Sequence, residues 1–82
     1  MSQTELTKKW EQECSGFLKG KRIAQVRYMT EKEAQDFGWY KRPLVIIFEG
    51  GGYIIPMADD EGNDGGAMST SNDKIPVIPV MH

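Results

Sequence analysis

The residues best suited to chemistry lie in one acidic, glycine-rich segment near the C-terminal end of the sequence. Between positions 59 and 64 it carries five side chains with oxygen ligands: Asp59, Asp60, Glu61, Asn63 and Asp64. Carboxylate and amide oxygens are the ligands that Ca²⁺ and Mg²⁺ prefer, and neighbouring glycines allow a chain to wrap around an ion. The sequence therefore predicts a candidate Ca²⁺ or Mg²⁺ site in this segment.

The spacing of these ligands fits an EF-hand loop poorly. If Asp60 takes the first position of such a loop, Asp64 and Gly65 fall where a ligand and a glycine are needed. The third position is then Gly62, and the last is Ser71, where a bidentate glutamate is required. Two other interpretations stay open: a solvated loop of Asx turns, and a carboxylate pair for acid–base chemistry. The latter needs a pocket with a second fixed group, so we do not expect an enzyme.

A second candidate site combines aromatic and basic side chains before the longest apolar run. Its members are Tyr28, Trp39, Tyr40, Lys41 and Arg42. Rings that stack on bases and cations that contact phosphates are typical of proteins that bind single-stranded nucleic acid. The net charge of −2 disfavours this function, because nucleic-acid-binding domains usually carry a net positive charge. The alternative is that the rings pack in the core and the cations line its solvated rim.

The single cysteine and the single histidine exclude several kinds of site. Cys14 can form no disulfide within the chain, and His82 is the last residue of the sequence. A zinc site or a histidine-activated nucleophile would have one thiol and one imidazole to draw on. We therefore expect no structural zinc, no catalytic triad and no cofactor, and we expect Cys14 to be buried as a small apolar residue.

The first element that must position these residues is an amphipathic helix within residues 1–20. Its apolar residues recur at helical spacing in one stripe: Leu6, Trp10, Cys14, Phe17 and Leu18. Ser2 and Glu5 match the capping-box pattern at its start, and Gly20 is a suitable stop. Because the stripe needs an apolar partner, we expect this helix to pack on a sheet, with Trp10 and Phe17 in the core.

A sheet with a short inserted helix is expected over residues 21–57. Residues 21–29 alternate between apolar and polar side chains, which predicts a strand with one solvated face. Thr30 and Glu33 then match a second capping box, so we expect a helix over residues 31–37.

The rest of the sheet is predicted around the longest apolar run. Residues 44–48 have the β-branched, uninterrupted apolarity of a central strand, and three glycines turn the chain into a hairpin partner over residues 53–57. Residues 58–74 are expected to form the acidic loop, and the proline-bearing residues 75–82 an edge strand. The chain is thus predicted to be one α+β domain on a small antiparallel sheet, with closure into an SH3-like partial barrel as one possible arrangement.

The charges are sorted along the sequence. Residues 1–42 contain nine Lys and Arg against six Asp and Glu, a net charge of +3. Residues 43–82 contain Lys74 against six acidic residues, a net charge of −5. Such asymmetry indicates either a partner surface or attraction between two halves of one fold.

Three stretches of the sequence carry a family resemblance: residues 38–43, 53–56 and 59–67. Over roughly residues 20–80 the chain resembles a group of short uncharacterised proteins encoded by phage and bacterial genomes. No activity is assigned to that group, so the resemblance implies no site residue. It implies the cytoplasm of a bacterium or of an infected host cell, which agrees with N-terminal residues unlike a signal peptide and with apolar runs far shorter than the ~20 residues of a membrane span.

These observations together predict a non-enzymatic module that binds another protein, and a phage accessory protein where the resemblance applies. We expect the contact surface at the edge formed by the last strand and the acidic loop, because unpaired strand edges and long loops are common binding surfaces of small domains. The alternatives are single-stranded nucleic acid bound through residues 19–42, and Ca²⁺ or Mg²⁺ bound at residues 59–64. No membrane partner is expected.

Overall fold

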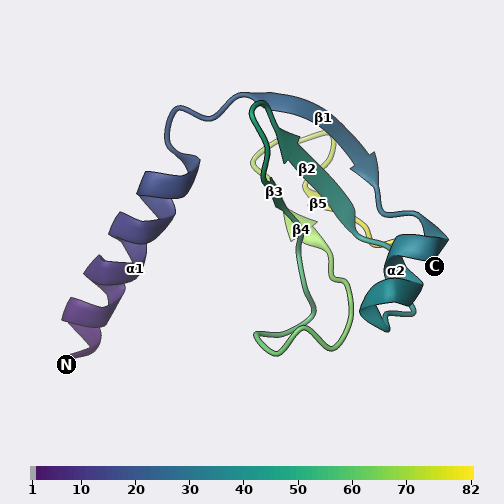
Figure 1. The fold of residues 1–82 in the computed structure, drawn as a ribbon, viewed down its shortest axis with the longest axis horizontal. Helices are drawn as coiled ribbons and strands as arrows, with labels where there is room; N and C mark the ends of the chain where they lie inside the picture. The colour runs from purple at the N-terminus through teal and green to yellow at the C-terminus, as the bar shows by residue number, and fades with distance from the viewer. Residues whose placement is uncertain (1) are drawn as a thin grey trace.

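The computed structural model describes residues 2–82, which form two helices and two antiparallel sheets (Figure 1). In chain order the elements are α1 (Gln3–Leu18), β1 (Ile23–Tyr28), α2 (Glu31–Phe37), β2 (Leu44–Phe48), β3 (Tyr53–Ile54), β4 (Met68–Ser69) and β5 (Val77–Ile78). The first sheet has the strand order β1-β2-β3, and the second pairs β4 with β5. The α+β class predicted from the sequence is confirmed.

β2 is the central strand of the larger sheet, as its continuous apolarity predicts. Its middle residue, Ile46, lies opposite Val26 of β1 and Ile54 of β3. The turn from β2 to β3 needs glycine, because all three residues at 50–52 have positive φ, between 80° and 105°. The predicted hairpin is therefore confirmed.

α2 begins and ends where the sequence predicts. The Thr30 hydroxyl accepts a hydrogen bond from the Glu33 amide at 3.1 Å, and the Glu33 carboxylate accepts one from the Thr30 amide at 2.9 Å. Gly38 ends the helix in the left-handed conformation, with φ 75°. Both ends of this short helix are thus fixed by side chains and backbone that the sequence identifies.

The core is small and lies between α2 and one face of the larger sheet. Its buried residues are Met29, Ala34, Trp39 and Val45, with Ile47 and Ile55 packed against them. Gly65 also approaches closely, since a Cβ there would lie 2.6 Å from Cδ of the buried Pro43. The segment after β3 is therefore held against the end of this core.

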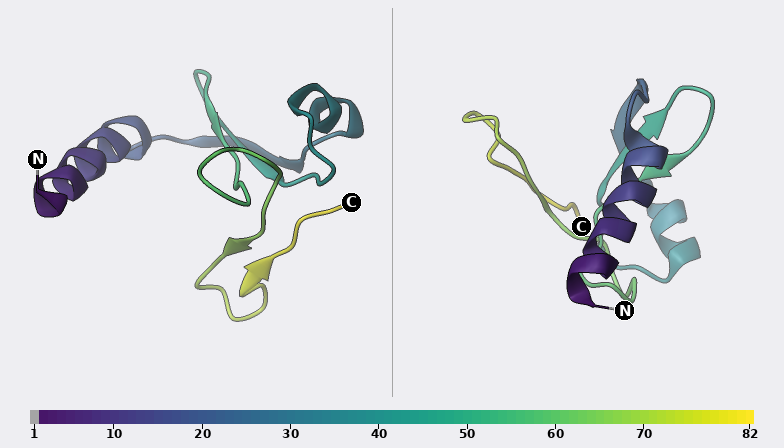
Figure 2. Two further views of the ribbon diagram at one scale, coloured as in Figure 1. Left: turned by 90° about the horizontal axis from the view of Figure 1, so that it is seen from below. Right: turned by 90° about the vertical axis from the view of Figure 1, so that its left-hand side faces the viewer.

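α1 stands away from the sheet, which contradicts the predicted packing (Figures 1 and 2). None of its residues is buried: Trp10 is 63% exposed, and Cys14 and Phe17 are exposed as well. At its C-terminal end the Phe17 ring meets the Phe48 ring edge to face, with centroids 5.8 Å apart. The predictions that Trp10, Cys14 and Phe17 are buried are therefore wrong, because helical spacing shows which face is apolar but not what covers it.

The capping of α1 also differs from the prediction in one bond. The Ser2 hydroxyl accepts from the Glu5 amide at 3.1 Å, as expected. The Glu5 carboxylate accepts from that same hydroxyl at 3.0 Å, where a capping box would use the Ser2 amide. The helix ends at Leu18, and Gly20 follows with φ 78°. This left-handed residue changes the direction of the chain between α1 and β1.

The C-terminal third forms a separate ribbon rather than part of a barrel. β5 pairs with β4, which places Met68 opposite Ile78. β5 confirms a strand within residues 75–82, whereas β4 lies inside residues 58–74, where the sequence predicts only a loop. A strand of two residues has too few alternating positions to reveal itself in the sequence. Within residues 2–82 the two sheets stay separate, so the SH3-like closure is not confirmed.

Candidate interaction surface

Trp39 belongs to the core and offers no ring for stacking on a base. It is 7% exposed, and its indole nitrogen donates to the Gly62 carbonyl oxygen at 2.7 Å. The Phe37 ring packs against it edge to face, with centroids 4.9 Å apart. This residue thus joins the end of α2 to the acidic segment, and its role is structural.

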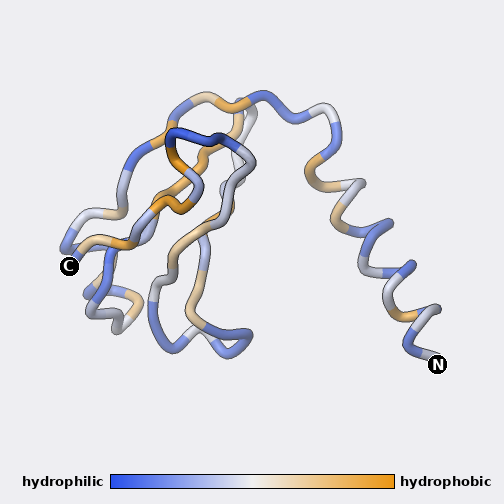
Figure 3. The backbone as a smooth tube through the Cα atoms, turned by 180° about the vertical axis from the view of Figure 1, so that it is seen from behind, coloured by the Kyte–Doolittle hydropathy of each residue, from blue (hydrophilic) through white to orange (hydrophobic). Residues whose placement is uncertain are grey.

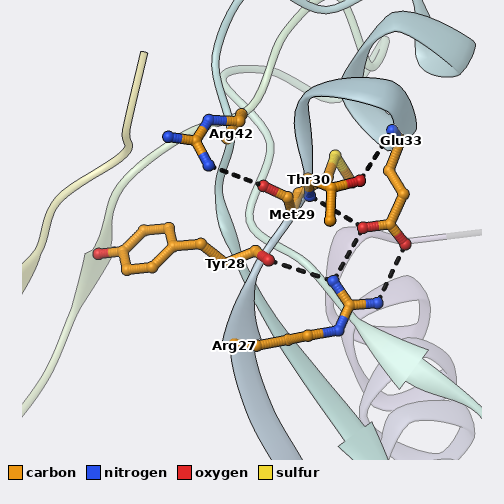
Figure 4. Close-up of polar contacts among 6 residues, drawn as sticks. All are labelled: Arg27, Tyr28, Met29, Thr30, Glu33 and Arg42. Atoms are coloured by element: carbon orange, nitrogen blue, oxygen red, sulfur yellow. Dashed lines mark hydrogen bonds and ion pairs between the residues drawn. The ribbon is translucent and has the colours of Figure 1, made fainter.

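Tyr28 and Arg42 hold the C-terminal segment of the chain. The Tyr28 hydroxyl donates to the Pro79 carbonyl oxygen at 2.7 Å. The backbone of Arg42 pairs with that of Met81 in an isolated bridge, and its guanidinium donates to the carbonyl oxygens of Met29 and His82, each at 3.3 Å. The Met29 contact appears in Figure 4. Both side chains therefore have partners within the chain.

Tyr40 and Lys41, the remaining members of this candidate site, differ in exposure. Tyr40 is 88% exposed, whereas Lys41 is partly buried and its amide donates to the Asp64 carboxylate at 3.0 Å. Of the five residues predicted from the sequence, Tyr40 is the one whose ring lies almost wholly in solvent. The structure thus does not assemble an aromatic and basic platform from these side chains.

In the acidic segment, the Asp59 carboxylate binds groups of its own loop. It accepts from the Glu61 and Asn63 amides at 3.0 and 3.3 Å, and from the Asn63 side-chain nitrogen at 2.9 Å. The hydrogen bond from the Asn63 side chain, followed by those from the backbone, lowers the pKa of Asp59 below its usual value. These bonds support the Asx-turn interpretation of the segment.

Asp64 ties the same segment to the residues before β2. Its carboxylate accepts from the Lys41 amide at 3.0 Å and from the Gly65 amide at 2.8 Å. Desolvation raises the pKa of Asp64, but these hydrogen bonds outweigh it and hold the pKa below its usual value. Asp60 and Glu61 are exposed. Across residues 2–82, no group of three or more His, Cys, Asp and Glu side chains is placed to hold a metal ion.

Arg27 and Glu33 form an ion pair that sequence reasoning missed (Figure 4). Two bonds, at 2.8 and 3.0 Å, join the guanidinium of β1 to the carboxylate of α2. The bond from Arg27, followed by that from the Thr30 amide, lowers the pKa of Glu33 from 4.5 to about 2. The capping box identifies Glu33, but its second partner depends on the angle between strand and helix, which the sequence does not show.

A stripe of exposed apolar side chains runs along α1. Leu6, Trp10, Phe17 and Leu18 are all exposed large apolar side chains of this helix. Figure 3 shows the apolar positions recurring between hydrophilic ones along its length. Beside Trp10, the side chains of Leu6, Lys9 and Glu13 line a shallow hollow. We call this surface the α1 stripe.

A groove lies beside α2 on the same face of the sheet as the core. Its volume is about 370 Å³, and its floor is apolar, with Val45, Ile47, Tyr53 and Ile55. Phe37 closes one side, and three charged residues stand at its rim: Arg27, Glu33 and Asp36. An apolar floor with a few polar groups at the edge is the usual character of a binding groove. We call this feature the α2 groove.

Comparison of the chain with models of known families, with curated proteins and with solved structures gives no match. None of the helices formed by residues 2–82 is long and apolar enough to cross a membrane. The geometry of the chain itself therefore carries the functional argument. Two of its surface features carry apolar side chains, the α1 stripe and the α2 groove.

Proposed function

We propose that this protein is a non-enzymatic interaction module that binds another protein through the α1 stripe. One observation carries the proposal: a helix of 16 residues exposes its apolar side chains and buries none of them. Most helical stability in proteins comes from packing of an apolar face, and no residue of α1 is buried. A partner that covers the stripe would supply that packing.

The charges of α1 favour a protein over a lipid surface as the partner. The helix carries Lys8 and Lys9 against Glu5, Glu11 and Glu13, a net charge of −1. Amphipathic helices that lie on anionic membranes carry mainly Lys and Arg on their polar face. Helices that enter a groove of another protein need an apolar stripe and a mixed polar face, which α1 has.

The two binding sites expected from the sequence, the acidic segment and the aromatic and basic cluster, are less suited to bind a partner than the α1 stripe. The carboxylates of Asp59 and Asp64 bind groups of the chain itself, and Trp39 is buried. Single-stranded nucleic acid would need exposed stacking rings in a basic groove. From the sequence resemblance, we place the proposed interaction in the cytoplasm of a bacterium or of an infected host cell, where the chain would act as an accessory protein.

Photocrosslinking in cells tests this function. Trp10 is replaced by p-benzoylphenylalanine in one variant and Lys8, which lies on the opposite face of α1, in a matched control. We expect discrete protein adducts from position 10 and none from position 8. Equal yields from both positions, no adducts, or adducts to lipid or nucleic acid alone would reject a protein partner at the stripe.

A further inference from the structure

We infer that the partner of the α1 stripe is a second copy of this chain, with Trp10 of each α1 seated in the α2 groove of the other copy. The inference rests on the proposed function, because it takes the stripe as the binding surface. One chain presents both an apolar ridge and an apolar groove. In a dimer with two-fold symmetry, such a pair is used twice and leaves neither surface exposed.

The exposed area of the chain is large enough for such a dimer. It is 6429 Å², whereas a folded monomer of 9.3 kDa exposes roughly 5,000 Å². The excess is about 1,400 Å², and a stable interface of standard size buries about 800 Å² on each partner. The radius of gyration, 14.4 Å, likewise exceeds the ~12 Å of a compact domain of this length. The helix that stands away from the sheet contributes to both excesses, as does the separate β4–β5 ribbon (Figure 2).

The helix is poorly placed to fill the groove of its own chain. Its C-terminal end is fixed where the Phe17 ring meets Phe48 and lies 3.5 Å from the position that a Cβ on Gly52 would occupy. The short linker to β1 is also fixed, since the Arg22 carbonyl oxygen accepts from the Glu49 amide at 2.8 Å. From this anchor α1 runs away from the sheet toward the N-terminus (Figure 1).

The base of the α1 stripe comes near one end of the groove at Gly52. This glycine lines the α2 groove, and a Cβ on it would lie 3.5 Å from the Phe17 ring. Phe17 itself packs on Phe48, whose side chain lies on the opposite face of β2 from Val45 and Ile47 of the groove. In a two-fold dimer each copy supplies one stripe and one groove, so a second copy can cover both features.

The rim of the groove and α1 each carry a net charge of −1, but one pair of opposite charges can meet across such an interface. At the rim of the groove Arg27 and Glu33 neutralise each other, which leaves Asp36 without an ion pair among residues 2–82. On α1, Lys9 stands beside Trp10 and has no ion pair within the same residues. Seating the indole of Trp10 on the groove floor would bring Lys9 to an acidic rim. Such pairs contribute mainly to orientation and choice of partner.

Sedimentation equilibrium of the purified full chain gives the first test. We expect a monomer–dimer equilibrium that Trp10→Glu weakens about 10-fold or more, because a large aromatic anchor usually dominates an interface of this kind. Lys8→Gln, on the opposite face of α1, should leave the equilibrium unchanged. Circular dichroism confirms that each variant is folded, which we expect because no residue of α1 is buried.

A mixing experiment separates groove docking from pairing of two α1 helices. Tyr53→Glu alters the floor of the groove at a residue that is itself exposed. Each variant alone should be monomeric at concentrations where the unchanged chain dimerises. A mixture of Trp10→Glu and Tyr53→Glu chains should regain association, since one intact helix then meets one intact groove. No gain on mixing would reject groove docking.

The charge contact has its own test. Lys9→Asp and Asp36→Lys should each weaken association, and combining both changes in one chain should restore it. A chain that remains monomeric up to millimolar concentration, or a dimer indifferent to both Trp10→Glu and Tyr53→Glu, overturns the second copy as partner. If position 10 still crosslinks to a different protein in cells, the proposed function survives that result. If neither association nor crosslinking occurs, both fall.

Discussion

The Glu33 carboxylate accepts three hydrogen bonds, and the two from Arg27 form an ion pair that depends on its charge. It accepts from the Thr30 amide, which caps α2, and it accepts two bonds from Arg27 of β1 (Figure 4). Arg27 also donates to the carbonyl oxygen of Tyr28 at 3.1 Å. The residue thus joins the strand, the turn and the helix at the rim of the α2 groove.

This arrangement predicts a pH dependence of stability. The pKa of Glu33 is lowered from 4.5 to about 2 in the folded chain, chiefly by Arg27. A carboxyl group with a lowered folded-state pKa stabilises the fold above its unfolded pKa, and this contribution is lost as the pH falls toward the folded value. Glu33→Gln should therefore lower the thermal midpoint at pH 7, and the difference should disappear between pH 4.5 and about 2.

The matched control is Glu31→Gln, in the same first turn of α2 but without an ion pair among residues 2–82. Thermal unfolding followed by circular dichroism across this pH range gives the comparison. If Glu31→Gln showed the same loss over the same range, the effect would belong to the helix dipole and not to the bonds with Arg27 and Thr30.

Replacement by phenylalanine is predicted to lower stability at Trp39 but not at Trp10. Trp39→Phe keeps an aromatic ring in the core but removes the hydrogen bond to the Gly62 carbonyl oxygen. We expect a loss of roughly 1 kcal/mol in the free energy of unfolding, measured in urea by circular dichroism. In dilute solution, where the chain is monomeric, Trp10→Phe should leave that free energy unchanged, because Trp10 is exposed. An equal loss in both variants would contradict the structural role of the indole nitrogen.

At the scale of the elements, the helices and strands that could be predicted are those whose signals lie within their own residues or next to them. α2 is predicted to the residue because its capping box and its C-terminal glycine lie within the helix or next to it. The central strand and its hairpin are predicted for the same reason, since continuous apolarity and three glycines act locally. The failures are contacts between distant segments. Neither the exposure of α1 nor the pairing of β4 with β5 follows from any local pattern.

The candidate site residues also separate into those with a local sequence signal and those whose role depends on distant contacts. Asx turns at Asp59 follow from residue type and spacing, so that alternative could be proposed from the sequence. The roles of Trp39, Tyr28 and Arg42 depend on contacts with Gly62 and with the C-terminal segment, 23 or more residues away. The α2 groove is likewise made by three segments together. A single sequence contains no local sign of such contacts.

The independence of α1 from the core predicts contrasting effects of two glycine substitutions. Gly16 lies inside α1, and a Cβ there would meet nothing within 4 Å, so Gly16→Ala should stabilise the helix by about 1 kcal/mol. Gly65→Ala should destabilise the domain, because its Cβ would lie 2.6 Å from Cδ of Pro43. Helical content from circular dichroism and the urea midpoint measure the two effects. Reduced helicity in Gly16→Ala would contradict the exposed position of that residue.

At the scale of the whole molecule, no ion pair among residues 2–82 joins the basic half of the chain to the acidic half. The ion pair within residues 2–82, Arg27 with Glu33, joins two residues of the basic half. The halves are linked by other means, such as the bond from the Lys41 amide to the Asp64 carboxylate and the bridge between Arg42 and Met81. Most charged side chains therefore stay available to a partner. This favours the interpretation that the sorted charges form a surface for a partner, over attraction between the two halves of the fold.

The separation of α1 from the rest of the chain predicts two levels of protection against hydrogen exchange. Amides of β2 bond to strands on both sides and pack against the core, so they should be protected at every protein concentration. Amides of α1 depend on a helix with no buried residue, so they should exchange rapidly in dilute solution. If a second copy covers the stripe, their protection should rise with concentration, and Trp10→Glu should abolish that rise. Hydrogen exchange followed by mass spectrometry at low and high concentration measures both regions in one experiment. Protection of α1 equal to that of β2 at the lowest concentration would mean that the helix packs within its own chain, contrary to this structure.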